Sequence, residues 1–303
     1  MKLVPHPQTP ATYKSLHSTA WTTIDINSSL ISSYREDYLD RSTFPSSLHF
    51  HDYYEVVVIL KGEIRYSCES ATVKPECCDV IVIPPGKFHM SLIAADETQY
   101  IRQVFYFYPD AFSRYQCSSL LNFTEAINSE NFSFSLSSDN KERLIRLIVK
   151  LKKYAQQDAA ANHALILADI LQIFHLFNQP IEAHLLADEY FPSSLIEIQN
   201  YIDEHFIDLN NTADVAATTF YSREHVSRLF KKYKKITVTE YILQRRINYS
   251  CQLMKSERTL ADICFQAGFG SVPAFIRAFK RVMGMTPSHY RRKLNTDAEV
   301  FRK

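Results

Sequence analysis

The stretch TLADICFQAGFGSVPAFIRAFKRVMG, residues 259–284, has the pattern of two short helices joined by a tight turn. Thr259 is suited to cap the first helix, because its hydroxyl can accept a hydrogen bond from a free backbone amide. Gly268 stands where the turn needs a compact or left-handed backbone. In the second helix Phe275 and Phe279 fall on one apolar side. The stretch therefore predicts a helix-turn-helix unit.

The same plan occurs about 49 residues earlier, in NTADVAATTFYSREHVSRLFKKYKK at residues 211–235. Asn211 or Thr212 can cap a first helix, and Ser222 can cap a second. Arg228 then takes the position that Arg277 has in the later copy. The lysines at the end suit both a helix C-terminus and DNA phosphates. A chance match would have to occur twice in the same register, so the repeat predicts two helix-turn-helix units.

A segment between the units, TVTEYILQRRINYSCQLMKS at residues 237–256, predicts one connecting helix. Roughly 19 residues of helix would be about 28 Å long. This length is close to the roughly 34 Å between successive major-groove faces on one side of B-DNA. A rigid helix of this length would set the second helix of each unit into adjacent turns of one groove.

Charge and composition support a nucleic-acid partner for this region. Residues 193–303 hold 18 lysines and arginines against 11 acidic residues, whereas residues 1–192 hold the remaining 16 and 22, so the net charge of +1 hides a basic back and an acidic front. No apolar run reaches the ~18 residues of a membrane helix. The opening MKLVPHPQTP lacks the apolar core of a signal peptide. Six cysteines without a C-x-x-C pair favour reduced thiols, and we expect a cytoplasmic protein.

Two segments, SRLFKK at 227–232 and QAGFGSVPAFIRAFKRVMGMTPSHYRR at 266–292, closely resemble the DNA-binding domain of AraC-type bacterial transcription regulators. The resemblance covers about 100 residues, and the terminal GMTPSHYR makes it specific. It implies sequence-specific binding to double-stranded promoter DNA and, usually, activation through RNA polymerase. Residue-for-residue matching gives as DNA-binding positions Ser222, Arg223, Glu224, Ser227, Arg228, Ser271, Val272, Pro273, Ile276 and Arg277.

The second unit departs from the usual pattern of this family. It has Val272, Pro273 and Ile276 where polar residues are common, and Ala274 where an aromatic is common. Apolar side chains can contact thymine methyl groups but cannot hydrogen-bond base edges. Arg277 is therefore expected to carry most of the directional readout there, while Pro273 also suits a first helical turn. Double-stranded RNA hides its major groove from helices, so paired units favour DNA.

The front of the chain has the pattern of strands. From about residue 20 to 110, short β-branched and aromatic runs are separated by turns such as Pro84-Pro85-Gly86. Such spacing favours a small barrel or a double-sheet sandwich. Two helices follow, at residues 139–157 and 163–177, and both need burial partners. These partners are expected to be the barrel wall, a second copy of the chain in a homodimer, or both.

Four residues of this front region, His49, His51, Glu55 and His89, resemble the metal ligands of the two cupin-barrel motifs. Alternate residues of a strand face the same way, so His49 and His51 are expected to point together into the barrel. Imidazoles and a carboxylate suit a divalent transition metal. Against this, Cys78 stands where the second motif normally has glycine, Ile93 stands where it has asparagine, and AraC-type sensor domains keep a similar string without being known as metal proteins.

Three roles for these four residues stay open: effector binding, metal binding, or a hydrogen-bonded structural network. Aromatic and arginine side chains commonly bind sugars or carboxylates, so further effector-binding candidates are taken from the strand region. The candidates are Trp21, Arg65, Tyr66, Arg102 and Tyr106.

The sequence thus predicts an α+β chain, with a cupin-like sensing barrel at 1–115, a helical linker and dimerisation region at 116–190, a DNA-binding domain at 191–295 and a tail at 296–303. Residues 1–20 form either an arm or a tail. We expect the protein to be a transcription regulator, an activator that is controlled by a small-molecule effector such as a sugar. We expect it to have no membrane partner, no catalytic activity and no required cofactor. The alternative is a metal-dependent cupin enzyme fused to a DNA-binding domain.

Overall fold

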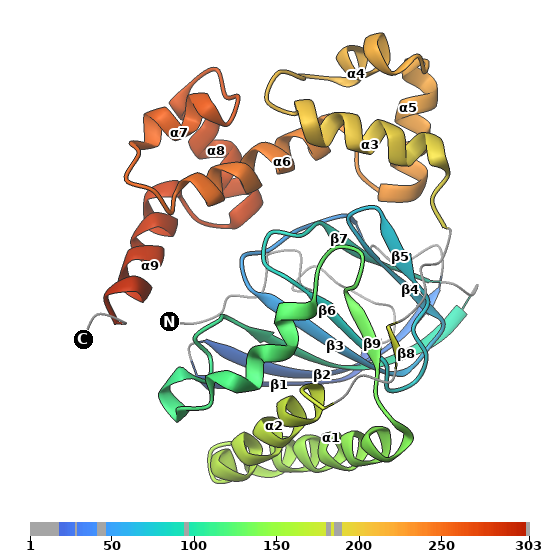
Figure 1. Cartoon of the computed structure of the whole chain (residues 1–303), viewed down its shortest axis with the longest axis vertical. Helices are drawn as coiled ribbons and strands as arrows, with labels where there is room; N and C mark the ends of the chain where they lie inside the picture. The colour runs from blue at the N-terminus through green and yellow to red at the C-terminus, as the bar shows by residue number, and fades with distance from the viewer. Residues whose placement is uncertain are drawn as a thin grey trace. The chain divides into compact units, whose positions relative to one another are not determined.

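The computed structural model describes residues 18–27, 29–40, 47–93, 97–179, 183–184 and 190–300. They form two compact units (Figure 1), the first of Met1–Ser46 and Phe50–Tyr190, the second of Ser47–His49 and Phe191–Lys303. Most of the predicted N-terminal arm and the last three residues of the predicted tail lie outside the described residues.

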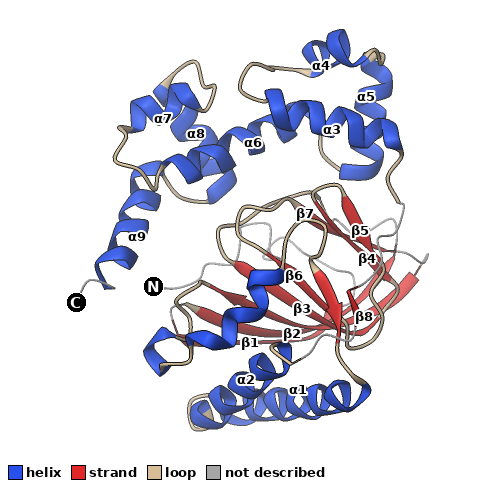
Figure 2. Ribbon diagram, in the orientation of Figure 1, coloured by secondary structure: helices blue, strands red, loops and turns tan. Residues whose placement is uncertain are grey.

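The first unit is built from two antiparallel sheets, drawn red in Figure 2. The larger has the order β1-β2-β8-β3-β6-β9-β10 and the smaller β5-β4-β7. The strands are β1 (Ser18–Asn27), β2 (Leu30–Asp40), β3 (Tyr54–Lys61), β4 (Ile64–Cys68), β5 (Ala71–Val73), β6 (Val80–Ile83), β7 (His89–Ile93), β8 (Glu97–Phe107), β9 (Ser133–Ser135) and β10 (Ala183–His184). The strand pattern predicted for residues 20 to 110 is confirmed, and β9 and β10 add a later edge.

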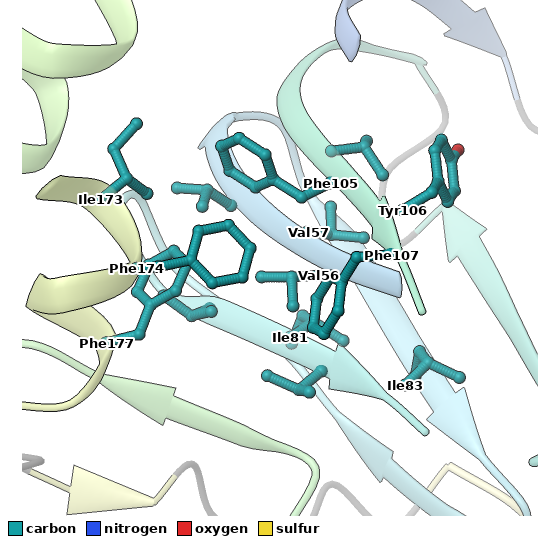
Figure 3. Close-up of a cluster of buried hydrophobic side chains, with 14 of the residues drawn as sticks. Val56, Val57, Ile81, Ile83, Phe105, Tyr106, Phe107, Ile173, Phe174 and Phe177 are labelled. Atoms are coloured by element: carbon teal, nitrogen blue, oxygen red, sulfur yellow. The ribbon is translucent and has the colours of Figure 1, made fainter. Parts of the chain in front are cut away.

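Strand β8 shows how the larger sheet separates its two faces. Phe105 and Phe107 lie on one face, where their rings contact Phe174 at centroid distances of 5.4 and 5.3 Å. Tyr100 and Tyr106 lie on the other face, because successive side chains of a strand point to opposite sides. Figure 3 shows the apolar side of this arrangement. One face thus packs on helices, and the other faces the smaller sheet with polar side chains.

The helices that cover this apolar face are α1 (Ser138–Asp158) and α2 (His163–Phe177). In α1 the buried residues Leu144, Leu147 and Ile148 follow the predicted helical spacing. Short 3-10 helices η1 (Ser113–Tyr115) and η2 (Ser118–Ala126) lead from the last long strand toward them. Both predicted helices are confirmed. The larger sheet is one of the surfaces against which they are buried.

The second unit is helical. Its elements are α3 (Ser193–His205), α4 (Thr212–Thr219), α5 (Arg223–Leu229), the π-helical turn η3 (Phe230–Lys234), α6 (Val238–Leu253), α7 (Leu260–Gln266), α8 (Val272–Met283) and α9 (Pro287–Val300). Helices α4 and α5 form the first helix-turn-helix unit, and α7 and α8 form the second. The predicted α+β architecture is confirmed.

Local sequence rules explain where these helices begin. The side chain of Asn211, not Thr212, caps α4 by accepting from the amide of Ala213 at 2.7 Å. Ser222 caps α5, and Thr259 caps α7. The predicted length of the connecting helix was too great: α6 begins after its cap Thr237 and has 16 residues, about 24 Å.

Candidate functional site

The first helix-turn-helix unit presents a polar surface on α5. Every position predicted there to bind DNA is exposed, while Val226, Leu229 and Phe230 on the opposite side are buried. The exposed positions are Ser222, Arg223, Glu224, Ser227 and Arg228. Within this surface a guanidinium nitrogen of Arg228 lies 3.1 Å from Nδ1 of His225, one helical turn away. The unit can therefore offer hydrogen-bond donors and acceptors to base edges.

The second unit presents a mixed surface on α8. Ser271, Pro273, Ile276 and Arg277 are exposed, and Val272 is half-buried. Phe275 and Phe279 form the buried side, as their spacing predicted. Pro273 lies in the first turn of the helix, where its missing amide proton has no cost. Arg277 is thus the basic side chain among the exposed predicted positions of α8.

Several basic residues of the helical unit are used for structure. Lys234 is 0% exposed, and its Nζ lies 4.0 Å from the centre of the Phe191 ring. Its burial removes it from the set of lysines suited to phosphates, whereas Lys231 and Lys232 are exposed. The charge pattern alone did not separate these lysines.

Arg246 of α6 fastens the loop between α3 and α4, which sequence reasoning missed. Its guanidinium donates hydrogen bonds to the backbone carbonyls of Phe206, Ile207 and Leu209 at 3.0, 2.8 and 2.8 Å. On the same helix Arg245 forms an ion pair with Asp203 of α3. The connecting helix is therefore tied to the scaffold of the first unit by charge.

A second candidate site lies between the two sheets of the first unit. Nε2 of His51 is 3.1 Å from Oε2 of Glu55 on β3, and Nε2 of His89 on β7 is 3.2 Å from the same oxygen. The ligand atoms of these three residues lie within 4.8 Å of one another. Both imidazoles are buried. Because β3 and β7 belong to different sheets, the cluster bridges them.

His49 is not part of this cluster. Its Nδ1 lies 2.8 Å from the carbonyl oxygen of Ser47, and it belongs to the short segment grouped with the helical unit. The expectation that His49 and His51 point together fails because β3 begins only at Tyr54, so strand alternation does not apply to them. Of the four predicted ligands, the structure brings three together.

Burial and pairing shift the protonation of the cluster in opposite directions. Burial lowers the pKa of His51, although the hydrogen bond to Glu55 acts against this shift. Burial alone would raise the pKa of Glu55, but the hydrogen bonds to His51 and His89 and their Coulombic attraction hold it well below its usual range. At neutral pH the carboxylate is therefore ionised beside a neutral His51.

Two of the predicted effector residues join a polar network beside the cluster. The hydroxyl of Tyr66 on β4 is hydrogen-bonded to the hydroxyl of Tyr100 on β8. Arg102 lies over the Tyr100 ring at 4.1 Å and donates to Asp37 at 2.8 Å. Sequence reasoning missed Tyr100 and Asp37, which the register of β2 and β8 places opposite each other, because alternation along a strand does not fix its register with the next strand.

Tyr106 lies on the same face of β8, with the guanidinium carbon of Arg35 5.6 Å from its ring centre. Burial raises the pKa values of Tyr66 and Tyr106, and raises that of Tyr100 to about 12. All three phenols therefore stay protonated at neutral pH and can donate hydrogen bonds. Glu55 contributes electrostatically to each of these shifts, which places the tyrosines and the carboxylate in one environment.

The other two predicted effector residues, Arg65 and Trp21, have no described contact with this polar network. Arg65 is next to Tyr66 on β4 and so points to the opposite face, where its guanidinium carbon lies 5.3 Å from the Tyr190 ring centre. Trp21 stands opposite Arg35 in the register of β1 and β2. The side chain of Trp21 lies outside the described residues.

Cys78 occupies the position for which the cupin motif normally has glycine, and its φ angle is +68°. Cys78 therefore adopts the left-handed backbone conformation that glycine would adopt at this position, although it carries a side chain. In the parts of the chain that the structure describes, no helix is long and apolar enough to cross a membrane.

Comparison with known protein families gives two matches. The model of a helix-turn-helix domain matches residues 215–293. The model of the AraC-like ligand binding domain matches residues 30–174. The first match runs from within α4 into α9, and the second runs from β2 through β9 and α1 to most of α2.

Individual proteins are also similar to this chain. The probable transcriptional regulator LumQ of Photobacterium leiognathi is 24% identical over 264 residues, 85% of this chain and 96% of that protein. Regulatory protein SoxS of Salmonella typhimurium is 37% identical over 95 residues, 31% of this chain and 89% of that protein. Among solved structures, ToxT from Vibrio cholerae has 14% identity and a TM-score of 0.35, covering 85% of this chain and 96% of ToxT.

Proposed function

The chain belongs to the AraC-type transcription regulators, and on that premise we propose how its two units act: the helical unit reads promoter DNA through α5 and α8, and the barrel unit binds a small effector that controls this reading. That the protein is a ligand-responsive DNA-binding regulator follows from the family. The observation that carries the residue-level proposal is that α5 and α8 each expose an arginine opposite a buried apolar side.

The DNA contacts are assigned by chemistry. Arg228 and Arg277 present guanidinium groups of the kind that bind guanine O6 and N7 in the major groove. Ser222, Ser227 and Ser271 supply hydroxyls, and the other positions contribute Arg223, Glu224 and the apolar side chains Val272, Pro273 and Ile276. Apolar contacts of α8 would recognise thymine methyl groups. The first unit thus supplies most of the hydrogen-bonded specificity.

The effector is a small polar molecule, with a sugar as the class that the side chains fit. Tyr66 and Tyr106 can donate hydrogen bonds, and Arg102 presents a cation beside them. Hydroxyl-rich ligands use such donors together with aromatic surfaces. The effector shifts the population between two states of the regulator only if it binds one state more tightly than the other.

The functional copy is a homodimer that forms through α1. Ile145 and Val149 lie one turn apart on this helix, on the side away from its buried face, and Val149 is 60% exposed. Apolar side chains at this spacing make a self-complementary stripe for a two-fold contact between copies.

The regulator acts in the bacterial cytoplasm, where promoters are, and it activates transcription by RNA polymerase as the family resemblance implies. It catalyses no reaction. We assign effector sensing to residues 1–115, the linker and dimer contact to residues 116–190, and DNA binding to residues 191–295. Helix α9 continues past the last of these boundaries to Val300.

Two experiments test this function. Selection of DNA by the full-length protein from a random-sequence library should yield a conserved site with two half-motifs about one helical turn apart. A thermal-shift screen against sugars and small acids should then identify a compound that raises the melting temperature, since a ligand of the native state stabilises it. Enrichment of no sequence would reject sequence-specific binding, and a screen without any shift would reject effector control.

A further inference from the structure

Cys77 and Cys78 lie at the centre of the tight turn between β5 and β6. The backbone amide of Asp79 donates to the carbonyl oxygen of Glu76 at 3.2 Å and closes this turn. The Asp79 carboxylate accepts in return from the amide of Glu76 at 2.7 Å. The amide of Cys78 donates to the carbonyl oxygen of Ile59 on β3 at 2.6 Å. The turn is therefore closed by its own hydrogen bonds and fixed to the larger sheet.

The two sulfur atoms of this turn lie 3.6 Å apart. The Cys77 side chain is exposed, whereas Cys78 is buried. The thiol of Cys77 also donates to the carbonyl oxygen of Leu60 at 3.3 Å, which orients it on the turn. One sulfur is therefore open to a reagent from solvent, and the second lies within reach of an atom that binds the first.

A sulfur–sulfur separation of 3.6 Å suits two thiolates that bind one soft atom. With sulfur bonds of about 2.3 Å, this separation gives an angle of about 100° at the bound atom. A pyramidal trivalent arsenic atom has bond angles close to this value. A linear two-coordinate ion would instead need the sulfurs about 4.6 Å apart, and a disulfide needs them about 2.0 Å apart.

The number of sulfur ligands also restricts the class of bound atom. Structural zinc sites use four protein ligands. In the part of the chain that the structure describes, the cluster of histidine, cysteine and acidic side chains suited to a metal ion does not include Cys77 or Cys78. Two sulfurs are enough only for a centre that brings its own third substituent. A trivalent arsenic atom with one organic group is such a centre.

We propose that Cys77 and Cys78 form a dithiol site that binds one trivalent arsenic atom carrying a single organic group. In an organoarsenic oxide, R–As=O, the arsenic forms one bond to each sulfur, its bonds to oxygen break, and the oxygen leaves as water with the two thiol protons. Arsenic stays trivalent, so the step consumes no oxidant or reductant. The exposed Cys77 bonds first, and Cys78 then closes the ring in an intramolecular step.

The protonation of the pair favours this reaction over oxidation to a disulfide. Burial raises the pKa of Cys78 to about 12, and the neighbouring Cys77 acts in the same direction. Because the thiolate is the nucleophile in disulfide formation, a protonated Cys78 reacts slowly with an oxidised Cys77. In the arsenic reaction the leaving oxygen accepts the thiol protons, so Cys78 does not have to ionise beforehand. The inference concerns the barrel unit alone and does not rest on the proposed function.

Titration of the reduced full-length protein with phenylarsine oxide tests the proposal. Mass spectrometry should show one added phenylarsenic group and the loss of two hydrogen atoms. The adduct should survive excess 2-mercaptoethanol, a monothiol, and be removed by 2,3-dimercaptopropanol, a dithiol, because both sulfurs must be displaced together. The melting temperature should rise on binding.

Variants assign the adduct to the turn. Cys77→Ser and Cys78→Gly should each weaken binding by about 100-fold or more, since the second bond gains from the effective concentration of the neighbouring thiol. Glycine adopts a positive φ without strain, so Cys78→Gly suits the +68° backbone of the turn. Cys117→Ser is the matched control, because Cys117 is a partly exposed single thiol, and it should bind as the wild type does.

Three results would overturn the proposal. The first is a wild-type protein that keeps no arsenic in the presence of the monothiol. The second is binding that Cys77→Ser and Cys78→Gly leave unchanged. The third is a loss of two hydrogen atoms without an added group, which would assign the pair to a disulfide. Melting temperatures of the unliganded variants confirm that they fold, and DNA binding is not involved in any of these measurements.

Discussion

Phe220 and Gly268 hold the same left-handed backbone conformation, with φ angles of 60° and 81°, in the turns of the two helix-turn-helix units. Their surroundings differ. The Phe220 side chain is fully exposed, at 101% of its reference area. A Cβ atom added to Gly268 would lie 2.6 Å from the carbonyl oxygen of Ile207 and 2.9 Å from Nε of Arg246. The same turn therefore tolerates a side chain in the first unit and excludes one in the second.

This difference predicts opposite behaviour of two single substitutions. Gly268→Ala should destabilise the helical unit by more than about 2 kcal/mol, because left-handed strain of roughly 1–2 kcal/mol adds to the backbone clash. Phe220→Gly relieves the strain but increases the freedom of the unfolded chain, so stability should change by less than about 1 kcal/mol. Calorimetry of the full-length variants measures both, and equal effects would contradict the account of the turn.

The apolar contact between α2 and the sheet should depend strongly on Phe174. Its ring contacts Phe105, Phe107 and Phe112 at centroid distances of 4.8 to 5.4 Å. Phe174→Ala should cost about 3–5 kcal/mol, since it removes a buried ring and leaves a cavity. The control is Phe265→Ala in α7, where the ring is 59% exposed and the cost should stay near or below about 1 kcal/mol. Thermal melts compare them, and a small effect at Phe174 would argue against this packing.

The sequence predicted those features that depend on local periodicity. The apolar spacing in residues 139–157 predicted α1, because burial on one face of a helix repeats every 3.6 residues, and the β-branched and aromatic runs before residue 110 predicted strands such as β8. Caps at Ser222 and Thr259 followed from their hydroxyls. The exposed and buried sides of α5 and α8 followed from the same periodicity.

Features set by long-range contacts could not be predicted in this way. His49 was placed with His51 by strand alternation, but β3 begins after both residues. Lys234 looked like its neighbouring lysines, yet its contact with Phe191 buries it. The clamp made by Arg246 joins residues about 40 positions apart. No periodic pattern marks such partners, so they became visible only in the folded chain.

A pH-dependent prediction concerns Asp169, which is buried on α2 on the same side as Ile166 and Ile173. Within the described ranges its Oδ2 atom has no hydrogen-bond partner. Burial raises its pKa above 3.8, and the attraction of Lys150 only partly opposes this. Since the folded-state pKa is raised, its contribution to stability is present below 3.8 and is lost as the pH rises through the folded-state value.

Asp169→Leu should therefore stabilise the protein at neutral pH, by about 1–3 kcal/mol, the cost of an unsatisfied buried polar group. The gain over wild type should grow as the pH rises from about 4 to about 7. Melting temperatures across this range measure it, with Glu125→Leu on the exposed surface of η2 as the control. A gain that stays constant with pH would show that the carboxyl ionisation is not its source.

The proposed dimer contact predicts that Val149→Glu separates the copies. A carboxylate on the apolar stripe of α1 would face its own symmetry mate across a two-fold axis, and like charges placed together repel. Light scattering after gel filtration should show a dimer for wild type and a monomer for the variant. Arg143→Glu, an exposed position of α1 about 120° around the helix from Val149, controls for added negative charge. A wild-type monomer at all concentrations would reject the dimer.

Sequence reading by the exposed arginines of α5 and α8 is the central claim, and the salt-matched affinity of the full-length protein for its selected site and for random DNA tests it most directly. Arg228→Ala and Arg277→Ala should each lose about 1–3 kcal/mol on the selected site and much less on random DNA, because base contacts carry the specificity. Arg146→Ala, an exposed arginine of α1, should change neither affinity. Equal losses on both DNAs would assign the two arginines to phosphates and contradict the claim.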